Sequence, residues 1–386
     1  MRINFDIGII GAGPAGSTAA AYLASYGFEI CLYEKKIFPR ETLCVEFLSH
    51  EVIHLLKEQN LFDKFISLNP NKINSFRLFN KSGESLYSKF EFEAFGLTRS
   101  LFDNLLLTNA IKKGVAVYQP AEVKEIINRK DFYEIIIEND GRIQKKIHVK
   151  HLIAAYGRKN PLDNFFKRRF TVYKSKLNGI KFHLSENELT NILKDEIHIY
   201  TGDKIYCGVN IVNNNKVTFC FLEKRVTGHP PPRKQLIELQ EKNKAFKKLF
   251  KTVEKNIFDE VPVYGTGNIY FGKRNLIEDG VFMIGDAAGV IVPLAGDGIG
   301  IAMESGKLIA DLFNKKRKEN LADSELRNLY QIEWNNLFLK RIGKAKVIQN
   351  IIMNKFYRGT GFQLCKLFPA LMPYFVKSTR NIPGKR

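Results

Sequence analysis

A glycine-rich turn near the amino terminus has the residue types and the spacing needed to hold a phosphate group. Gly11-Ala-Gly-Pro-Ala-Gly16 follows an apolar run and precedes a stretch with small residues at helical spacing. In such a turn Gly11 permits the tight bend, Gly13 lets a pyrophosphate approach backbone N–H groups, and Gly16 lets the helix pack closely on the strand. The phosphate would then lie at a helix N-terminus, which favours negative charge.

Two strands and one helix must position this turn. The sequence predicts a first strand over 5–10, the helix over 15–25 and a second strand over 29–34. These elements fit within about 30 residues, the size of one βαβ unit. Glu34 ends the second strand, where an acidic side chain accepts hydrogen bonds from both hydroxyls of a ribose and repels a 2′-phosphate. The pattern therefore predicts a bound dinucleotide that carries no 2′-phosphate.

A second glycine-rich segment favours FAD over NAD as this dinucleotide. It runs from Gly285-Asp286 through Pro293 to Gly300, between a strand predicted at 280–284 and a helix predicted at 301–313. Asp286 is placed to hold a sugar-alcohol hydroxyl, and the later glycines, including Gly296 and Gly298, expose N–H groups at a helix N-terminus. Such a site suits the pyrimidine edge of an isoalloxazine, which gains negative charge on reduction. We expect bound FAD, with NADH or NADPH as the transient reductant.

The remaining segments predict an α/β fold with a second domain inserted into the first. Alternating stretches such as 196–200 and 217–222 are typical of antiparallel strands. A helix is predicted over 100–112, strands over 134–138 and 148–154, and a Lys-rich helical stretch over 235–250 after a turn at 228–232. We expect a Rossmann-type FAD-binding domain over 1–70, 99–160 and 265–330, a mostly antiparallel β-sheet substrate domain over 71–98 and 161–264, and a basic helical C-terminal extension over 331–386.

Taken together, these motifs resemble the flavoprotein superfamily that contains para-hydroxybenzoate hydroxylase-like monooxygenases and geranylgeranyl reductases. The resemblance covers nearly the whole chain. It implies a glutathione-reductase-like FAD-binding domain, in which Arg99 at the start of a helix contacts FAD and Asp286 binds the ribitol. The other cofactor-binding residues that we expect are Ala15, Lys35, Arg40, Cys44, Val123, Pro293 and Ile299.

Three segments depart from the patterns of that superfamily. Cys44-Val45-Glu46 resembles the Cys-Gly-Glu segment of the reductase branch, but Val45 replaces the glycine. Tyr156-Gly157-Arg158 stands where the hydroxylases carry an Asp-Gly motif linked to FAD and NADPH binding. The only tryptophan, Trp334, does not form the aromatic-Trp-aromatic-Pro signature of archaeal geranylgeranyl reductases. We assign no catalytic residue from the sequence.

The sequence predicts an FAD-dependent oxidoreductase, and we favour a monooxygenase-like enzyme acting on a hydrophobic or aromatic small molecule. The first alternative is a geranylgeranyl reductase-like enzyme that reduces polyprenyl double bonds. The second is a membrane-associated flavin electron carrier without catalysis of its own. Tyr200, Tyr206 and the aromatic residues around Phe182 are candidates for a substrate pocket, although aromatic residues at strand spacing are more often core.

His50-Glu51-Val-Ile-His54 matches a zinc-binding pattern, in which two imidazoles on one helix face hold the metal. We expect no metal, because no third ligand is evident and the match immediately follows the Cys44 segment. Ser49 is the predicted N-cap of this helix. The five cysteines include no C-x-x-C pair, so they predict neither a disulfide framework nor a zinc site.

The net charge of +20 is concentrated at the carboxyl end of the 386-residue chain. No Asp or Glu follows Glu333, whereas eleven Lys and Arg residues do. Apolar residues lie between them, which suits either an anionic membrane surface or a helical appendage packed on the enzyme. Nucleic acid is disfavoured because no recognition motif accompanies the charge. Without a signal-peptide pattern at the start, we expect a cytoplasmic location, with possible peripheral attachment to the inner membrane face.

Overall fold

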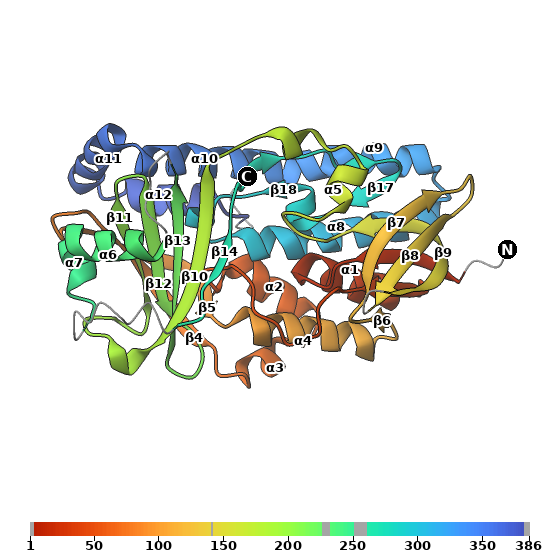
Figure 1. Ribbon diagram of the computed structural model, residues 1–386, viewed down its shortest axis with the longest axis horizontal. Helices are drawn as coiled ribbons and strands as arrows, with labels where there is room; N and C mark the ends of the chain where they lie inside the picture. Colours follow the sequence, from red (N-terminus) through yellow and green to blue (C-terminus); the bar gives the residue numbers. More distant parts are fainter. Residues whose placement is uncertain (1–3, 140–141, 226–231, 251–260, 382–386) are drawn as a thin grey trace.

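The computed structural model describes residues 4–139, 142–225, 232–250 and 261–381. Residues 228–231 of the expected turn lie outside this part of the chain. Two β-sheets lie side by side along the long axis, and helices α9 (Asp323–Trp334) and α10 (Lys340–Met353) run beside both (Figure 1). This arrangement confirms the expected α/β fold with a second β-sheet and a helical carboxyl-terminal region.

The first sheet has the parallel core of a dinucleotide-binding fold. Its central strands are β9 (Arg142–Ala154), β1 (Phe5–Ile10), β2 (Ile30–Tyr33) and β6 (Ala116–Tyr118). Each neighbouring pair among them is parallel, and β17 (Val281–Met283) adds to β9 in the same direction. The antiparallel strands are β16 (Ile277–Glu278), β7 (Glu122–Asn128) and β8 (Tyr133–Asn139). Because the parallel strands end at one edge, the loops that follow β1, β2 and β17 come together there.

The helices that support this edge are α1 (Pro14–Ser25), α4 (Arg99–Lys112) and α8 (Gly298–Glu319). Helix α8 extends beyond the predicted range of 301–313 at both ends, so its first turn already contains Gly298. Helices α1 and α8 approach closely at Gly306, where a Cβ atom would lie 2.5 Å from the backbone oxygen of Ala15. This contact ties the first glycine-rich segment to the helix that follows the second one.

The second sheet is mostly antiparallel, as expected, with one parallel pair. Its order is β14 (Tyr264–Thr266), β10 (Leu177–Ser185), β13 (Lys216–Lys224), β12 (Ile205–Ile211), β11 (Glu196–Gly202), β4 (Asn71–Phe79), β5 (Ser85–Gly96) and β3 (Phe47–Leu48). Strands β4 and β11 are the parallel neighbours. Helices α6 (Pro232–Lys242) and α7 (Lys244–Lys247) contribute to the apolar core on one face. The Lys-rich helical stretch predicted over 235–250 consists of two helices, because the Asn243 side chain accepts from two backbone amides and starts a new helix there.

The carboxyl-terminal helices lie against the other face of the second sheet. Helix α10 continues from α9 through a π-helical segment, η5 (Asn335–Leu339), and leads to α11 (Lys355–Leu367) and α12 (Leu371–Ser378). Phe362 and Met372 from these helices join Phe76 and Phe90 of the sheet in one buried cluster. The extension therefore packs on the enzyme.

None of the described helices combines the length and the apolar content that crossing a bilayer requires.

Candidate functional site

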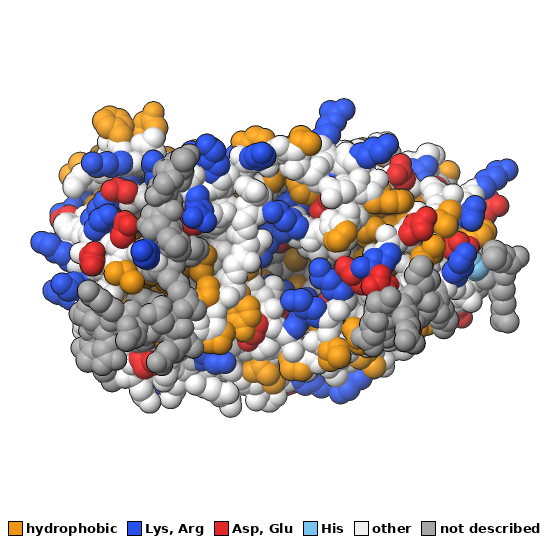
Figure 2. All heavy atoms as spheres, viewed as in Figure 1, with side chains coloured by type: hydrophobic (Ala, Val, Ile, Leu, Met, Phe, Trp, Pro, Cys, Tyr) orange, Lys and Arg blue, Asp and Glu red, His pale blue; other side chains and the backbone are white. Residues whose placement is uncertain are grey.

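A cavity of about 740 Å³ lies at the carboxyl edge of the first sheet and collects both glycine-rich segments. The expected cofactor-binding residues that line it are Gly11, Gly13, Ala15, Glu34, Lys35, Arg40, Cys44, Arg99, Val123, Asp286, Pro293, Gly296, Gly298 and Ile299. Gly16 and Gly285 do not line it. The space-filling view shows Lys and Arg side chains around a hollow in the middle of the molecule (Figure 2).

The first glycine turn has the backbone geometry that its sequence predicts. Gly11 has a φ of +101°, and a Cβ atom there would lie 2.6 Å from the backbone oxygen of Ala155. At Gly16 a Cβ atom would lie 1.9 Å from the Gly11 oxygen, so only glycine fits this close packing of α1 on β1. At Gly13 the nearest atom to such a Cβ is 3.9 Å away, which leaves room on the cavity side. Gly16 therefore supports the turn from behind, and Gly13 faces open space.

Glu34 directly follows β2 beside this turn and is buried. One of its carboxylate oxygens accepts from the backbone amide of Ala12 at 3.0 Å, and the other accepts from that of Lys36 at 3.0 Å. These bonds orient the carboxylate within the wall of the cavity.

Two arginines place positive charge along the same wall. Arg99 donates two hydrogen bonds to Asp103, at 2.6 and 2.7 Å. Arg40 lies 3.5 Å from Asp103 and 3.7 Å from Glu34. The Nε atom of Arg40 is buried and has no hydrogen-bond partner among the described residues. Because a buried donor without a partner costs free energy, Arg40 is suited to an additional anionic ligand.

The second glycine-rich segment closes the cavity from the opposite side. Asp286 lines it and lies 3.6 Å from Arg158. Gly285 donates its backbone amide to the Ser305 hydroxyl at 2.8 Å, which fixes the loop to α8. Gly296, with a φ of +61°, adopts the left-handed conformation that favours glycine, and it turns the chain into the first residues of α8. The cavity therefore has one helix N-terminus at each glycine segment.

A family model described as an FAD binding domain matches residues 4–326. The chain belongs to this FAD-binding family. It is 25% identical over 346 residues to digeranylgeranylglycerophospholipid reductase of Methanocaldococcus jannaschii, with 86% of this chain and 82% of that protein covered. The flavin-dependent halogenase armH3 of Armillaria mellea is 35% identical over 137 residues, which cover 33% of this chain and 26% of that protein.

A solved structure shares the fold. It is the geranylgeranyl bacteriochlorophyll reductase-like protein of Thermoplasma acidophilum, which has a TM-score of 0.74 and 19% identity, covering 90% of this chain and 87% of that one. These findings confirm the expected superfamily and an FAD-dependent enzyme.

The cavity fits FAD by its polar groups. The first turn of α1 and the Arg40 guanidinium would meet the pyrophosphate, Glu34 the adenosine ribose and Asp286 the ribitol. The first turn of α8 would meet the pyrimidine edge of the flavin. The residue assignments remain predictions for this chain, and the open space at Gly13 and the unpartnered Arg40 donor support them.

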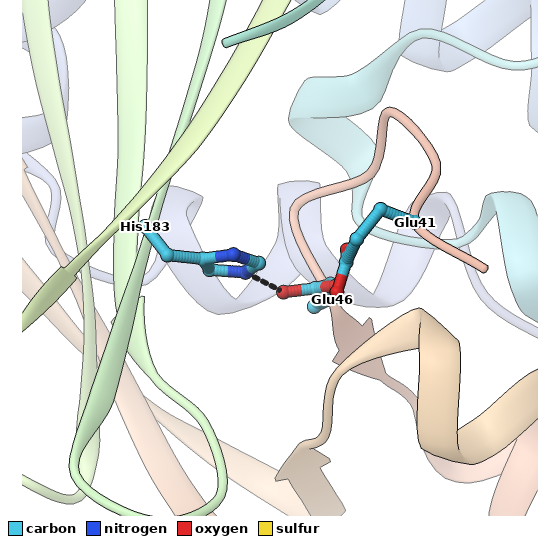
Figure 3. A group of neighbouring side chains, drawn as sticks. All are labelled: Glu41, Glu46 and His183. Atoms are coloured by element: carbon cyan, nitrogen blue, oxygen red, sulfur yellow. Dashed lines mark hydrogen bonds and ion pairs between the residues drawn. The ribbon is translucent and has the colours of Figure 1, made fainter. Parts of the chain in front are cut away.

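A buried ionic cluster, which the sequence did not reveal, fixes the loop that passes the flavin site. Glu46 of that loop accepts from Lys181 at 2.5 Å and from His183 at 2.7 Å, both on β10. Figure 3 shows the contact between Glu46 and His183, with Glu41 beside it. It also accepts from the Thr218 hydroxyl at 2.6 Å and from the backbone amide of Arg99 at 2.8 Å. Burial alone would raise the pKa of Glu46, but His183 and Lys181 lower it to about 2. Glu46 thus connects the start of α4 to the second sheet.

Glu41, Glu46 and His183 are close enough to one another for metal ligation, yet a cation already lies between the two carboxylates. The ammonium group of Lys181 is 2.5 Å from Glu46 and 2.8 Å from Glu41. Although burial opposes it, the charge of Glu46 keeps the pKa of Lys181 raised. The ammonium group of Lys181 therefore neutralises one of the two carboxylate charges and occupies the space between them.

The carboxyl-terminal extension contacts residues 295–297, the loop before α8 that we call the flavin loop, through a second buried cluster. Arg380 donates to the backbone oxygens of Ala295 at 2.6 Å and Gly296 at 3.2 Å, and it lies 3.3 Å from Asp297. Arg341 donates to Asp297 at 2.5 Å and to Glu304 at 2.6 Å. No sequence signal connects these residues, because they are far apart along the chain. The extension thereby holds the loop that precedes α8.

Replacing Arg380 with leucine is expected to weaken FAD binding about tenfold, because the Ala295–Gly296 backbone loses its charged donors. Arg358→Leu is the matched control. Arg358 donates to Gly202 at 2.6 Å and pairs with Asp203, so it anchors the same extension away from the loop. FAD affinity is measured by fluorescence titration of the apoprotein. Equal losses in the two variants would contradict a specific role for Arg380.

Asp297 also predicts a pH dependence of stability. Burial and the nearby charge of Glu51 raise its pKa to about 7, against the opposing charges of Arg341 and Arg380. The folded state therefore binds more protons than the unfolded state between the ordinary value of 3.8 and about 7, and stability falls as pH rises through this window. Glu304→Gln removes a neighbouring carboxylate. We expect this variant to lose less of its free energy of unfolding, measured in urea, as pH rises from 5 to about 8. Glu319→Gln, at the exposed end of α8, should leave this loss unchanged.

A second cavity, of about 280 Å³ and almost wholly apolar, lies between the second sheet and helices α10, α11 and α12. It meets the flavin cavity at five residues that line both, Val45, Phe47, Cys220, Pro293 and Gly296. Tyr206 lines the apolar cavity, with its hydroxyl donating to Gln349 at 3.0 Å. Tyr200 and Phe182 instead lie in the core, where they stack on Phe79 and Phe219. Of the three expected aromatic positions, the cavity contains only Tyr206.

The zinc-like pattern has a structural explanation. Helix α2 (His50–Glu58) begins after Ser49, but the Ser49 hydroxyl donates to Asp297 at 3.2 Å and does not cap the helix. Glu51 is buried and accepts from the backbone amide of Asn381 at 2.8 Å. This glutamate therefore faces the carboxyl-terminal cluster, whereas His54 is exposed.

Tyr156, which stands in place of the expected aspartate, lines the flavin cavity. Its hydroxyl donates to Asp163 at 2.8 Å and accepts from Arg168 at 3.1 Å. Asp163 and Arg168 are both buried, so an ionic network backs this part of the wall.

Proposed function

We propose that this protein is an FAD-dependent reductase that acts on a carbon–carbon double bond of a long, apolar, lipid-like substrate. The observation that carries the proposal is the apolar cavity that meets the flavin cavity at Val45, Cys220 and Pro293. A pocket of this composition selects its ligand by apolar burial. The similarity to digeranylgeranylglycerophospholipid reductase over 86% of the chain supports the same substrate class.

The cavity lining favours reduction over the hydroxylation that we favoured from the sequence. Phenol hydroxylation calls for a base, and among the described residues that line the apolar cavity there is no carboxylate and no imidazole. Its two arginines, Arg358 and Arg380, are held by Asp203 and by the flavin loop. The presence of this cavity also favours an enzyme that binds a substrate over an electron carrier, because a carrier without catalysis of its own needs no substrate pocket.

Reduction of a double bond requires a hydride on one carbon and a proton on the other. FAD held at this site and reduced by NADH or NADPH would supply the hydride. Among the described residues that line both cavities, Cys220 is the one whose side chain carries a transferable proton. Burial raises the pKa of its thiol to about 12, so the thiol stays protonated at neutral pH, while the nearby charges of Lys181 and Arg158 oppose this rise and would stabilise the thiolate left after donation. We propose Cys220 as the proton donor.

The reaction is tested by mass spectrometry after anaerobic incubation of the FAD-loaded protein with NADH or NADPH and geranylgeraniol. A product heavier by two hydrogens is expected. A product heavier by one oxygen, formed only after air is admitted, would instead establish hydroxylation.

Replacing Cys220 with alanine is expected to slow this reduction about 100-fold, the typical effect of losing a positioned acid. Cys365→Ala is the matched control, because Cys365 also lines the apolar cavity but does not line the flavin cavity. Rates are measured in single turnovers of pre-reduced protein. Equal rates in the two variants would remove Cys220 from the mechanism.

A further inference from the structure

The outer face of helix α11 carries large apolar side chains in solvent. Phe356 is 74% exposed and Leu367 is 72% exposed, and they lie near Tyr357 and Phe368, which are also exposed. Figure 2 shows hydrophobic side chains projecting beside Lys and Arg side chains at the end of the molecule that α11 forms in Figure 1. An apolar group of this kind on a surface marks an interaction site.

The spacing along α11 separates this face from the one that packs on the enzyme. Phe362 and Cys365 are buried against the second sheet. Phe356, Thr360, Gln363 and Leu367 recur at the three- and four-residue intervals that define a helix face, and all four are exposed. Because the helix already buries one apolar side, the exposed Phe356 and Leu367 at the two ends of the other face are not explained by packing within this chain.

The charges around this face favour an anionic partner. Lys355 and Lys366 of α11 are exposed, although Lys366 pairs with Glu84, and the preceding helix α10 carries the exposed Lys344 and Lys346. No acidic residue follows Glu333 in the sequence. A two-fold contact between copies of the same face would bring these lysines together and would be opposed by their repulsion. Aromatic residues with flanking lysines instead suit the interface of an anionic bilayer.

The apolar cavity extends to the same helix. Arg358, Gly361, Phe362, Leu364 and Cys365 of α11 line it, and Leu364 is also 46% exposed. One side chain thus belongs both to the cavity wall and to the protein surface. The cavity therefore ends beside the exposed apolar face.

We propose that α11 lies in the surface of an anionic membrane through Phe356, Tyr357, Leu367 and Phe368, and that the apolar cavity takes up its substrate from that bilayer. The docking rests on the surface of α11. The uptake of substrate rests on the proposed function.

Flotation of the FAD-loaded, oxidised protein with vesicles tests the docking without substrate or reductant. Binding is expected to vesicles of equal parts phosphatidylcholine and phosphatidylglycerol, to be weaker with phosphatidylcholine alone, and to decrease in high salt. Phe356→Ser combined with Leu367→Ser should lower binding at least about tenfold, because two apolar side chains no longer enter the bilayer. Val172→Ser with Tyr173→Ser removes two exposed apolar side chains outside the extension and should bind like the wild type.

Several outcomes would overturn the docking proposal. One is that the wild-type protein does not bind the anionic vesicles. A second is that both double variants lose binding equally. A third is that the wild type is a dimer, the α11 variant is a monomer, and neither protein binds vesicles. Retention of FAD absorbance confirms that each variant is folded. Failure of double-bond reduction leaves these outcomes unchanged, so the two proposals are tested separately.

Discussion

Gly16→Ala is expected to leave the protein largely without FAD. A Cβ atom at this position would lie 1.9 Å from the Gly11 oxygen and 3.1 Å from the Ala155 side chain. Gly11 and Ala155 directly follow β1 and β9, so the first sheet holds both in place. Helix α1 must therefore move away, which displaces the backbone amides of its first turn. Overpacking of this kind costs about 1–3 kcal/mol, which corresponds to about 5- to 150-fold in affinity. The measurement is FAD titration of the apoprotein, followed by absorbance and fluorescence.

Gly343→Ala is the control for this experiment. Gly343 is also a helical glycine, in α10, but a Cβ atom there meets nothing within 4 Å. Alanine should therefore stabilise the helix by up to about 1 kcal/mol and leave the FAD affinity unchanged. If Gly16→Ala bound FAD as tightly as the wild type, the first glycine turn would not be the phosphate site.

Glu46→Gln is expected to give the largest loss of stability, about 3–5 kcal/mol. The substitution removes the charge between Lys181 and His183, which leaves the fully buried Lys181 with Glu41 as its only acidic partner in the cluster. Removing one partner of a buried ion pair costs more than the pair contributed, because the remaining charge stays buried with weaker compensation. Urea unfolding, followed by the circular dichroism of the FAD-loaded protein, measures the change in the free energy of unfolding.

The control is Glu93→Gln at the surface. Glu93 pairs with Lys57 at 2.6 Å, but both side chains are about half exposed, so less than about 1 kcal/mol should be lost. The effect at Glu46 also has a defined pH dependence. Its pKa is lowered from 4.5 to about 2, so the stability that the carboxylate contributes is present above 4.5 and is lost as pH falls towards 2. Equal losses in the two variants would show that the Glu46 cluster contributes no more than a surface pair.

Gly16 and Glu46 differ in whether the sequence alone reveals their role. Gly16 belongs to a motif within a single βαβ unit, and its role follows from the spacing of three glycines. Glu46 draws its partners from β10, β13 and the start of α4. No local pattern predicts such a cluster, because a buried Lys and Glu have the same identity in sequence as an exposed pair.

The same contrast applies to the carboxyl-terminal extension. Its composition predicted basic, amphipathic helices and left open whether they pack on the enzyme or bind a membrane. The structure shows that opposite faces of α11 differ, with Phe362 buried against the second sheet and Phe356 in solvent. Arg341 and Arg380 meet the flavin loop at Asp297 only because the helices that follow α8 fold back on that loop.

By itself the sequence determined the βαβ unit, the two glycine-rich segments, the FAD-binding superfamily and most strands. These features depend on periodicity and on backbone conformations that only glycine adopts, which are local properties. Only the tertiary structure decided which buried charges pair, where the apolar cavity meets the flavin cavity and which face of α11 remains in solvent. These depend on contacts between segments far apart in the chain, where burial and distance, not residue type, set the interaction energies.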